Sequence, residues 1–230
     1  MQISDLKPAG TFANQYGVKA IVYGGPGTGK TPLISTCPKP IMLACEPGLL
    51  SMRGSKVPTY DAFTSIRIDE FFRWLFSSTE VKNFDTICID STSQMCEIYL
   101  QDITQGKSKA GNKVHGLAAY GEMAKSVLDH LRPLYYMQNK HTYLVAKQEL
   151  TPLNNISTYR PYYPGKQLAI EIPHMYDAIL RLAIHNVPGM GQVKAFRCQG
   201  SIDEVARDRT GVLAEFEPPD FGLLVQKAMK

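Results

Sequence analysis

The sequence predicts an α/β fold: a mostly parallel central sheet flanked by helices, with an antiparallel edge near the C-terminal end of the chain. Short apolar runs typical of buried strands alternate with amphipathic stretches typical of helices, which favours parallel strands joined by helical crossovers. The last two apolar runs are instead joined by the turn at 186–191, a pattern typical of an antiparallel hairpin.

The individual elements follow from the same patterns. The apolar runs predict strands at 18–23, 40–45, 85–90, 142–147, 176–184 and 193–199. The amphipathic stretches predict helices at 69–79, 91–104, 117–138 and from Asp220 onward. A helix after the first strand should be short, because Pro38 and Pro40 stop it within about two turns. No internal repeat or long linker divides the chain, so we expect one domain over 1–230, with 1–16 as an N-terminal extension.

The composition is that of an ordinary globular protein. The 230 residues carry a net charge of +4, and 44% of them are hydrophobic. The first ten residues lack an apolar core and no uncharged apolar stretch approaches about 20 residues, so we expect neither a secretory signal nor a membrane span. The cysteines form no C-x-x-C pair and the histidines are dispersed, which predicts reduced core thiols, a cytoplasmic protein and no metal cluster.

An octet directly after the first strand carries the clearest functional signal. It matches the pattern G-x-x-x-x-G-K-[ST] with the residues Gly24, Gly25, Pro26, Gly27, Thr28, Gly29, Lys30 and Thr31. Small residues let the backbone curl so that its N–H groups face a polyphosphate. Lys30 can reach the β- and γ-phosphates, and the Thr31 hydroxyl can ligate Mg²⁺. A glycine-rich turn is the alternative, but strand, lysine and threonine together predict a nucleoside triphosphate site.

Two acids are expected beside this loop, because the carboxyl ends of parallel strands meet at one edge of a sheet. Asp90 ends the strand 85–90 and would hold Mg²⁺ opposite Thr31, although an acid here can also cap the next helix. Glu46 follows the strand 40–45 and is the candidate that activates the attacking water, with a solvated loop acid as the alternative. The competitor, Glu97, would lie about two turns along a helix from this edge.

A third group at this edge is Gln148, which follows the strand 142–147. A neutral amide at this place can hydrogen-bond a γ-phosphate and detect its loss on hydrolysis. Outside this context, a glutamine after a strand would carry no functional meaning.

The order of these features resembles the RecA/RadA-type ATPase core: the loop at 24–31, strands ending at Glu46 and Asp90, and a strand ending near Gln148. The resemblance implies that Glu46 is the catalytic acid, that Gln148 senses the γ-phosphate, and that ATP and Mg²⁺ are the ligands. The small size and the segment 207–211 look most like the phage-encoded minimal RecA-like proteins implicated in single-strand annealing and recombination. This implies a homo-oligomer (ring or filament), a location in the host-cell cytoplasm, and single-strand-binding or recombination proteins as partners.

The same resemblance implies DNA-binding loops at 105–116 and 149–167, two long polar stretches without regular pattern. The first offers groups that could follow a phosphate backbone, namely Lys107, Lys109, Lys113 and His115. The second offers stacking faces and cations suited to single-stranded DNA, namely Tyr159, Arg160, Tyr162, Tyr163 and Lys166. A solvated loop is the alternative for the lysines, and a core or subunit interface is the alternative for the tyrosines.

Arg207 and Arg209 could be ordinary surface charges. In a RecA-like assembly a cation from one subunit can reach the γ-phosphate bound to its neighbour, and Arg209 is the candidate for that role. The leading hypothesis is a DNA-stimulated ATPase that binds single-stranded DNA and assists phage recombination or annealing. Two alternatives stay open: a helicase-loader or regulatory ATPase that acts on a protein partner, and a nucleotide-dependent oligomeric scaffold with negligible hydrolysis.

Overall fold

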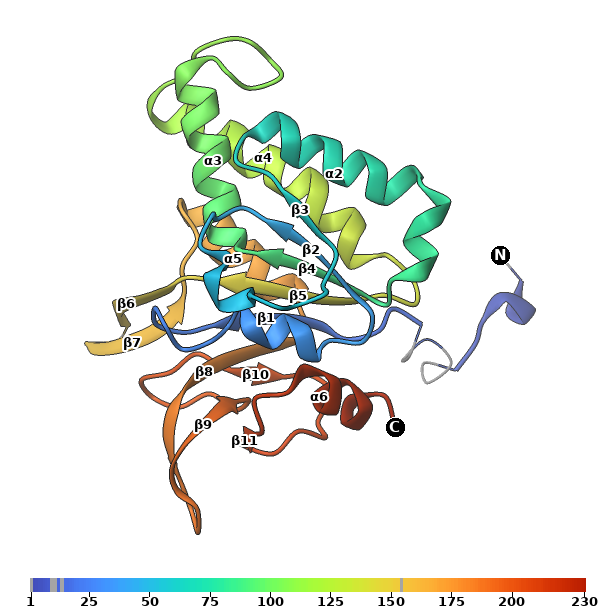
Figure 1. Cartoon of the computed structure of the whole chain (residues 1–230), viewed down its shortest axis with the longest axis vertical. Coiled ribbons are helices and arrows are strands. Elements are labelled where there is room, and N and C mark those ends of the chain that lie inside the picture. Colours follow the sequence, from blue (N-terminus) through green and yellow to red (C-terminus); the bar gives the residue numbers. More distant parts are fainter. Residues whose placement is uncertain (1, 9–11, 13–14, 154) are drawn as a thin grey trace.

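The computed structural model describes residues 2–8, 12, 15–153 and 155–230. Residues 1, 9–11 and 13–14 of the expected N-terminal extension, and Asn154 in the expected loop 149–167, lie outside the described residues. The described part of the extension contains a short 3₁₀ helix, η1 (Ile3–Asp5), which lies beyond the main body (Figure 1).

A nine-stranded sheet forms the centre of the molecule, with the strand order β11-β9-β8-β1-β5-β4-β2-β3 and β10 paired to β8. The strands are β1 (Lys19–Tyr23), β2 (Pro40–Ala44), β3 (Thr59–Asp61), β4 (Thr86–Asp90), β5 (His141–Ala146), β8 (Ala178–Val187), β9 (Gly191–Arg197), β10 (Arg207–Asp208) and β11 (Phe216–Glu217). The pairs from β8 through β1, β5, β4 and β2 to β3 are parallel. The pairs β8–β9, β8–β10 and β9–β11 are antiparallel, so the predicted fold class is confirmed.

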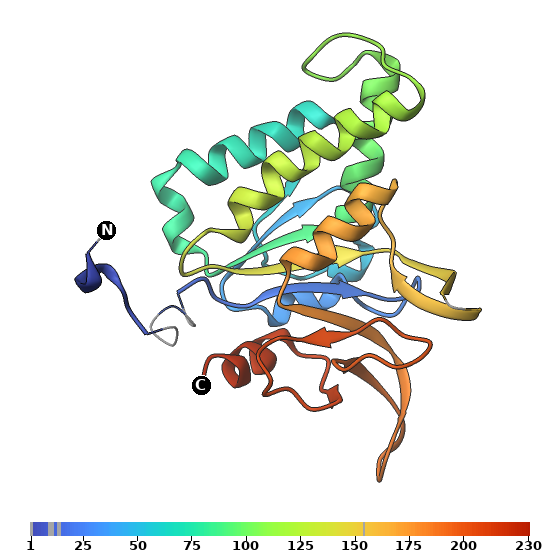
Figure 2. The same cartoon turned by 180° about the vertical axis from the view of Figure 1, so that it is seen from behind.

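Helices cover both faces of this sheet, as Figures 1 and 2 show. The helices are α2 (Ser65–Ser77), α3 (Thr92–Gln105), α4 (Gly116–Tyr135), α5 (Lys166–Met175) and α6 (Phe221–Ala228), with shorter 3₁₀ turns η2 (Pro32–Thr36), η3 (Leu49–Met52) and η4 (Thr79–Asn83). Helices α2 to α5 pack on one face, and η2 and α6 pack on the other. Because side chains alternate along a strand, Ile21 and Tyr23 of β1 enter the first core, and Ala20 and Val22 enter the second.

Most predicted elements are present with shifted ends. Helix α2 begins four residues earlier than the predicted 69–79, because the Thr64 hydroxyl accepts a hydrogen bond from the Arg67 N–H and caps the helix. The helix after the loop at 24–31, which we call the phosphate loop, is short, as predicted. All five cysteines are buried and unpaired. None of the helices described here is long and apolar enough to cross a membrane.

The expectation of an irregular loop over 149–167 was wrong. This stretch forms a separate antiparallel hairpin of β6 (Gln148–Leu153) and β7 (Ile156–Pro161), and α5 begins at its end. Strand β7 is tied to a later part of the chain, since the Tyr159 N–H donates to the Asp203 carbonyl at 2.7 Å and the Val205 N–H donates to the Tyr159 carbonyl at 2.9 Å. These partners are distant in sequence, and the local pattern therefore gave no sign of them.

Candidate functional site

The segment Gly24–Thr31 connects β1 to η2, and its geometry requires glycine at three positions. A Cβ at Gly24 would lie 2.3 Å from the backbone oxygen of Leu182, which leaves no room for a side chain. Gly27 and Gly29 adopt left-handed backbone angles, with φ of +73° and +94°. The loop therefore curls tightly against β8, in a shape suited to presenting backbone N–H groups to an anion.

A cavity of about 490 Å³ lies where β1, β2, β4 and β5 end. It brings together eight of the residues expected from the sequence, namely Gly24, Pro26, Gly27, Lys30, Thr31, Glu46, Asp90 and Gln148. Ser91, Val145 and Lys147 complete its walls. The remaining loop residues do not line the cavity. The Thr28 hydroxyl donates to the Gly25 carbonyl at 3.0 Å within the loop, and Gly29 lies beside the Lys194 ammonium. The parallel topology, rather than closeness in sequence, assembles this site.

Lys30 lies over the phosphate loop. Its ammonium donates to the carbonyl oxygens of Gly24 and Gly25, each at 2.8 Å. Burial lowers the pKa of Lys30, and the nearby carboxylates of Asp90 and Glu46 oppose that shift. Among the described residues, this ammonium has hydrogen-bond partners only at these two backbone carbonyls, so its charge stays available to a phosphate oxygen. The residues here therefore fit a bound polyphosphate.

Asp90 and Thr31 supply the oxygen groups that a magnesium ion prefers. Asp90 is 5% exposed, and its pKa is raised to about 6, first by burial and also by Glu46, while the Thr31 hydroxyl and Lys30 act in the opposite direction. Lys30 offsets only part of the cost of this buried charge, and a divalent metal bound with phosphate and water would stabilise the carboxylate further. The described residues contain no cluster of three or more His, Cys, Asp or Glu side chains that could hold a metal by themselves.

Glu46 is positioned by the residue that follows Asp90. The Ser91 hydroxyl donates to Glu46 Oε1 at 2.6 Å, and the Asp90–Ser91 peptide bond is cis. Strand β2 pairs with β4 so that Ala44 lies opposite Asp90, which brings Glu46 to the same edge of the sheet. Glu97 does not line the cavity, and its carboxylate pairs with Lys147 at 2.6 Å.

The sequence assigns no role to two residues near the cavity. Lys147 lines the cavity, and its ammonium contacts Gln94 Oε1 at 2.7 Å and Glu97 Oε2 at 2.6 Å. Arg181 donates from Nε to Gln148 Oε1 at 3.1 Å. Arg181 stands between Leu180 and Leu182 in an otherwise apolar run, and a lone arginine in a buried strand is a signal that could have identified it.

The first set of expected DNA-binding groups lies away from the cavity. Lys107, Lys109, Lys113 and His115 are exposed on the connection between α3 and α4. Helix α3 starts beside the cavity and has 14 residues, so it carries this connection about 21 Å away. Figures 1 and 2 both show the connection well separated from the β6–β7 hairpin.

The second set is divided between hairpin, core and helix. Tyr163 is 3% exposed and packs in the core, so it cannot stack on a base, and this part of the expectation was wrong. Arg160 is paired with Glu149 at 2.8 Å, and the ring of Tyr159 lies against Arg181. Tyr162 is half-buried, and Lys166 is exposed as the first residue of α5.

Arg209 lies at the opposite edge of the sheet from the phosphate loop. Its guanidinium donates to the carbonyls of His174 at 2.7 Å and Met175 at 3.4 Å, at the C-terminal end of α5. Its backbone N–H donates to the Asp177 carbonyl, next to the start of β8. Arg209 therefore caps a helix in its own chain and does not reach the cavity of that chain.

A family model described as AAA domain matches residues 16–210. None of the curated proteins matches the sequence. Similar solved structures include the flagellar accessory protein FlaH from Methanocaldococcus jannaschii, with 10% identity, a TM-score of 0.40 and 84% of each chain covered. They also include the RadB recombinase, with 16% identity, a TM-score of 0.43, and 82% of this chain and 84% of that one covered.

The family match spans most of the chain and contains the phosphate loop, Glu46, Asp90 and Gln148. Its extent therefore includes every residue that the structure gathers at the cavity. The chain belongs to the AAA domain family.

Proposed function

We propose that this protein binds and hydrolyses ATP with Mg²⁺, and that hydrolysis controls its binding to single-stranded DNA. In this proposal the protein assists phage recombination or annealing. The observation that supports the ATPase part is the convergence of Lys30, Thr31, Glu46, Asp90 and Gln148 on one cavity. In this proposal residues 1–230 act as one ATPase domain that assembles with further copies of itself.

The chemistry assigns one task to each group. Lys30 and the loop N–H groups bind the polyphosphate, and Thr31 with Asp90 would hold Mg²⁺, which neutralises charge on the phosphate oxygens. Glu46 accepts a proton from water as the water oxygen attacks the γ-phosphorus. The bond from that phosphorus to the bridging oxygen breaks, leaving ADP and inorganic phosphate. The Gln148 amide hydrogen-bonds the γ-phosphate and loses this partner after hydrolysis.

The DNA part is supported by charge and connectivity. Exposed cations lie on the α3–α4 connection, and Gln148 is the first residue of the β6–β7 hairpin, so a change at the cavity acts directly on that hairpin. A protein partner is the second candidate, because Leu150 of β6 is 53% exposed and Ile202, whose carbonyl accepts from the Thr158 hydroxyl of β7, is 73% exposed. Exposed apolar side chains favour contact with protein over contact with a phosphate backbone.

The first test is ATP turnover by the wild-type chain and by Lys30→Ala. We expect hydrolysis that requires Mg²⁺ and falls by at least about a hundredfold in the variant, since Lys30 is the cation over the loop. Release of inorganic phosphate measures this. Absence of turnover in a wild-type chain that still binds ATP would favour the nucleotide-dependent scaffold.

The second test is anisotropy of a labelled poly-dT oligonucleotide with an ATP analogue, with ADP, or without nucleotide, at two salt concentrations. We expect binding that requires the analogue and weakens with salt, because phosphate contacts release counterions. Replacing Lys107, Lys109 and Lys113 by alanine should weaken binding, whereas Lys125→Ala on α4 serves as a lysine control. Absence of binding under every condition would reject the DNA part and favour the protein partner.

A further inference from the structure

The orientation of the Gln148 amide is fixed by its neighbour. Arg181 donates from Nε to Gln148 Oε1 at 3.1 Å, and a guanidinium can only donate, so the atom facing it must be the amide oxygen. The amide nitrogen then faces the phosphate loop: Nε2 lies 4.0 Å from the position that a Cβ on Gly25 would take. An N–H donor directed at the loop suits an anion, whereas the oxygen would repel it.

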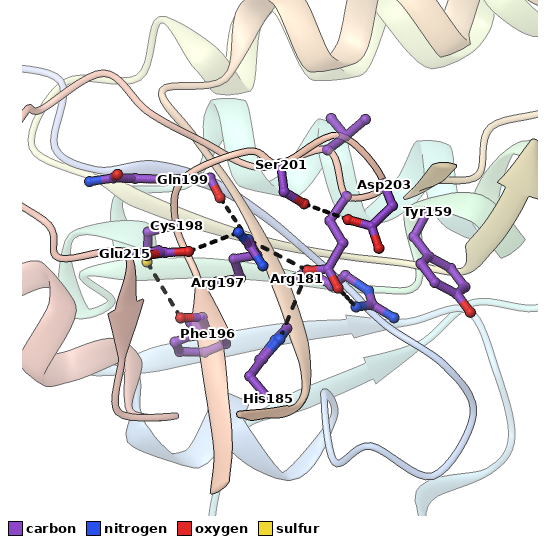
Figure 3. A network of polar contacts seen from close by, with 12 residues as sticks. Tyr159, Arg181, His185, Phe196, Arg197, Cys198, Gln199, Ser201, Asp203 and Glu215 are labelled. Atoms are coloured by element: carbon purple, nitrogen blue, oxygen red, sulfur yellow. Dashed lines mark hydrogen bonds and ion pairs between the residues drawn. The ribbon is translucent and has the colours of Figure 1, made fainter. Parts of the chain in front are cut away.

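Arg181 is itself held on several sides. It lies in β8, opposite Tyr23 at the end of β1, and its side chain is 11% exposed. Its guanidinium bonds the Glu204 carboxylate and lies 4.1 Å from the centre of the Tyr159 ring. Figure 3 shows Arg181 next to Tyr159. A cation between a carboxylate and an aromatic face, with little water around it, has few other orientations available.

Glu204, which pairs with Arg181, belongs to the segment 203–205 that hydrogen-bonds strand β7 of the hairpin. Glu204 is 9% exposed and stands between Asp203 and Val205, whose backbone groups bond Tyr159 on both sides. The Tyr23 hydroxyl also donates to the carbonyls of Val205 at 2.7 Å and Tyr159 at 3.1 Å. The end of β1, the hairpin and the 203–205 segment therefore meet around one guanidinium.

We propose that Arg181 is the positioning residue that turns the Gln148 amide donor toward the γ-phosphate and thereby lets the site distinguish ATP from ADP. This inference rests on the proposed ATP site. Arg181 does not line the cavity, and Glu204 offsets its charge, so it acts on the nucleotide through Gln148 and makes no contact of its own. Without Arg181, the Gln148 amide can rotate and present either its nitrogen or its oxygen.

The test is the affinity of the full chain for a non-hydrolysable ATP analogue and for ADP, measured by calorimetry with Mg²⁺. In Arg181→Met, the dissociation constant for the analogue should rise about tenfold, the equivalent of one hydrogen bond, while that for ADP stays unchanged. Gln148→Ala should give the same loss, and the double variant should lose no more than either single one, because both changes remove the same interaction.

Two further variants separate positioning from structural damage. Arg197→Met is the matched control, since Arg197 lies 3.6 Å from the same Glu204 carboxylate but does not contact Gln148, and it should keep the ATP preference. Arg181→Met with Glu204→Gln leaves no unpaired buried charge, and should repeat the loss with a better folded chain. An unchanged ATP preference in both Arg181 variants, or equal weakening for ADP, would overturn the proposal. A wild-type chain that binds neither nucleotide would instead reject the proposed ATP site.

Discussion

At the scale of single residues, Glu46 has one carboxylate oxygen fixed and one free. Ser91 donates to Oε1, while Oε2 has no hydrogen-bond donor among the residues that the structure describes. Glu46 lines the cavity and is half-buried. One oxygen anchored and one open toward the cavity is the arrangement that a group needs to take a proton from a bound water.

Glu46→Gln should therefore slow the chemical step and leave binding intact. We expect kcat for ATP hydrolysis to fall by about 10² to 10⁴, the usual contribution of a general base, with little change in affinity for an ATP analogue. Steady-state phosphate release and calorimetry check the two parts. Glu97→Gln is the matched control, because Glu97 does not line the cavity. Equal turnover in Glu46→Gln and the wild type would show that another group activates the water.

The residues at the cavity differ in how far the sequence could reveal them. Lys30, Thr31, Glu46, Asp90 and Gln148 each follow a strand or belong to the loop motif, and parallel topology places all such positions at one edge. Tyr163 also follows a strand, but it turns into the core, and no local pattern distinguishes a tyrosine that packs inward from one that stacks on a base.

At the scale of elements, α6 supports the loop at 24–31 from the face of the sheet on which η2 also packs. Phe221 packs edge-on against Tyr143, with ring centres 5.0 Å apart, and the Tyr143 hydroxyl donates to the Lys30 carbonyl at 3.0 Å. The helix is short, so its start matters: Asp220 accepts from the Leu223 N–H at 2.9 Å and caps it. Thr36 of η2 accepts from the Phe221 N–H at 2.9 Å and joins the two elements.

Removal of this cap should loosen α6. We expect Asp220→Ala to lower the free energy of unfolding by about 1 kcal/mol, because one N–H of the first turn loses its acceptor. Asp220→Asn is the control that keeps an accepting oxygen, and it should change the free energy by less. Urea unfolding followed by circular dichroism measures both. Indistinguishable Asp220→Ala and Asp220→Asn curves would mean that water replaces the cap without loss.

The elements that the sequence predicts well are those whose burial is continuous. Strands β1, β2, β4 and β5 are apolar runs buried on both faces, and the pattern alone locates them. Strand β3 has three residues, which are too few to show the alternation of apolar and polar side chains that identifies a strand. The β6–β7 hairpin is half-exposed, and its backbone bonds to residues 203 and 205, which are distant in sequence. Helix α5 is difficult to predict from the sequence, because it contains Pro173 and a proline normally interrupts a helix.

At the scale of the whole molecule, one buried lysine links the sheet to the end of the longest helix. Lys19 begins β1 and is fully buried. Its ammonium donates to the carbonyls of Leu134 at 3.4 Å, Met137 at 3.1 Å and Lys140 at 2.8 Å, around the C-terminal end of α4. Burial lowers the pKa of Lys19 to about 8, and Asp177 acts in the opposite direction.

This lysine should make stability depend on pH in the alkaline range. The unfolded chain keeps the Lys19 proton up to a pKa of 10.5, whereas the folded chain releases it near pH 8. Between these values the unfolded state binds more protons, so the contribution of Lys19 to the free energy of unfolding rises with pH. We expect the free energy of unfolding of the wild type, relative to that of Lys19→Met, to increase between pH 8 and pH 10. Urea unfolding of both chains measures this difference. A constant difference between the two chains would contradict this assignment.

The contacts of Tyr159 with residues 203–205 also set an order of events during synthesis. The ribosome makes the phosphate loop, Glu46, Asp90 and Gln148 first, and the segment that holds the hairpin leaves the ribosome later. A growing chain therefore contains every residue that lines the cavity before Glu204 is made to hold Arg181. The cavity takes its final shape only after β8 is made, because the loop at 24–31 packs against Leu182 of that strand.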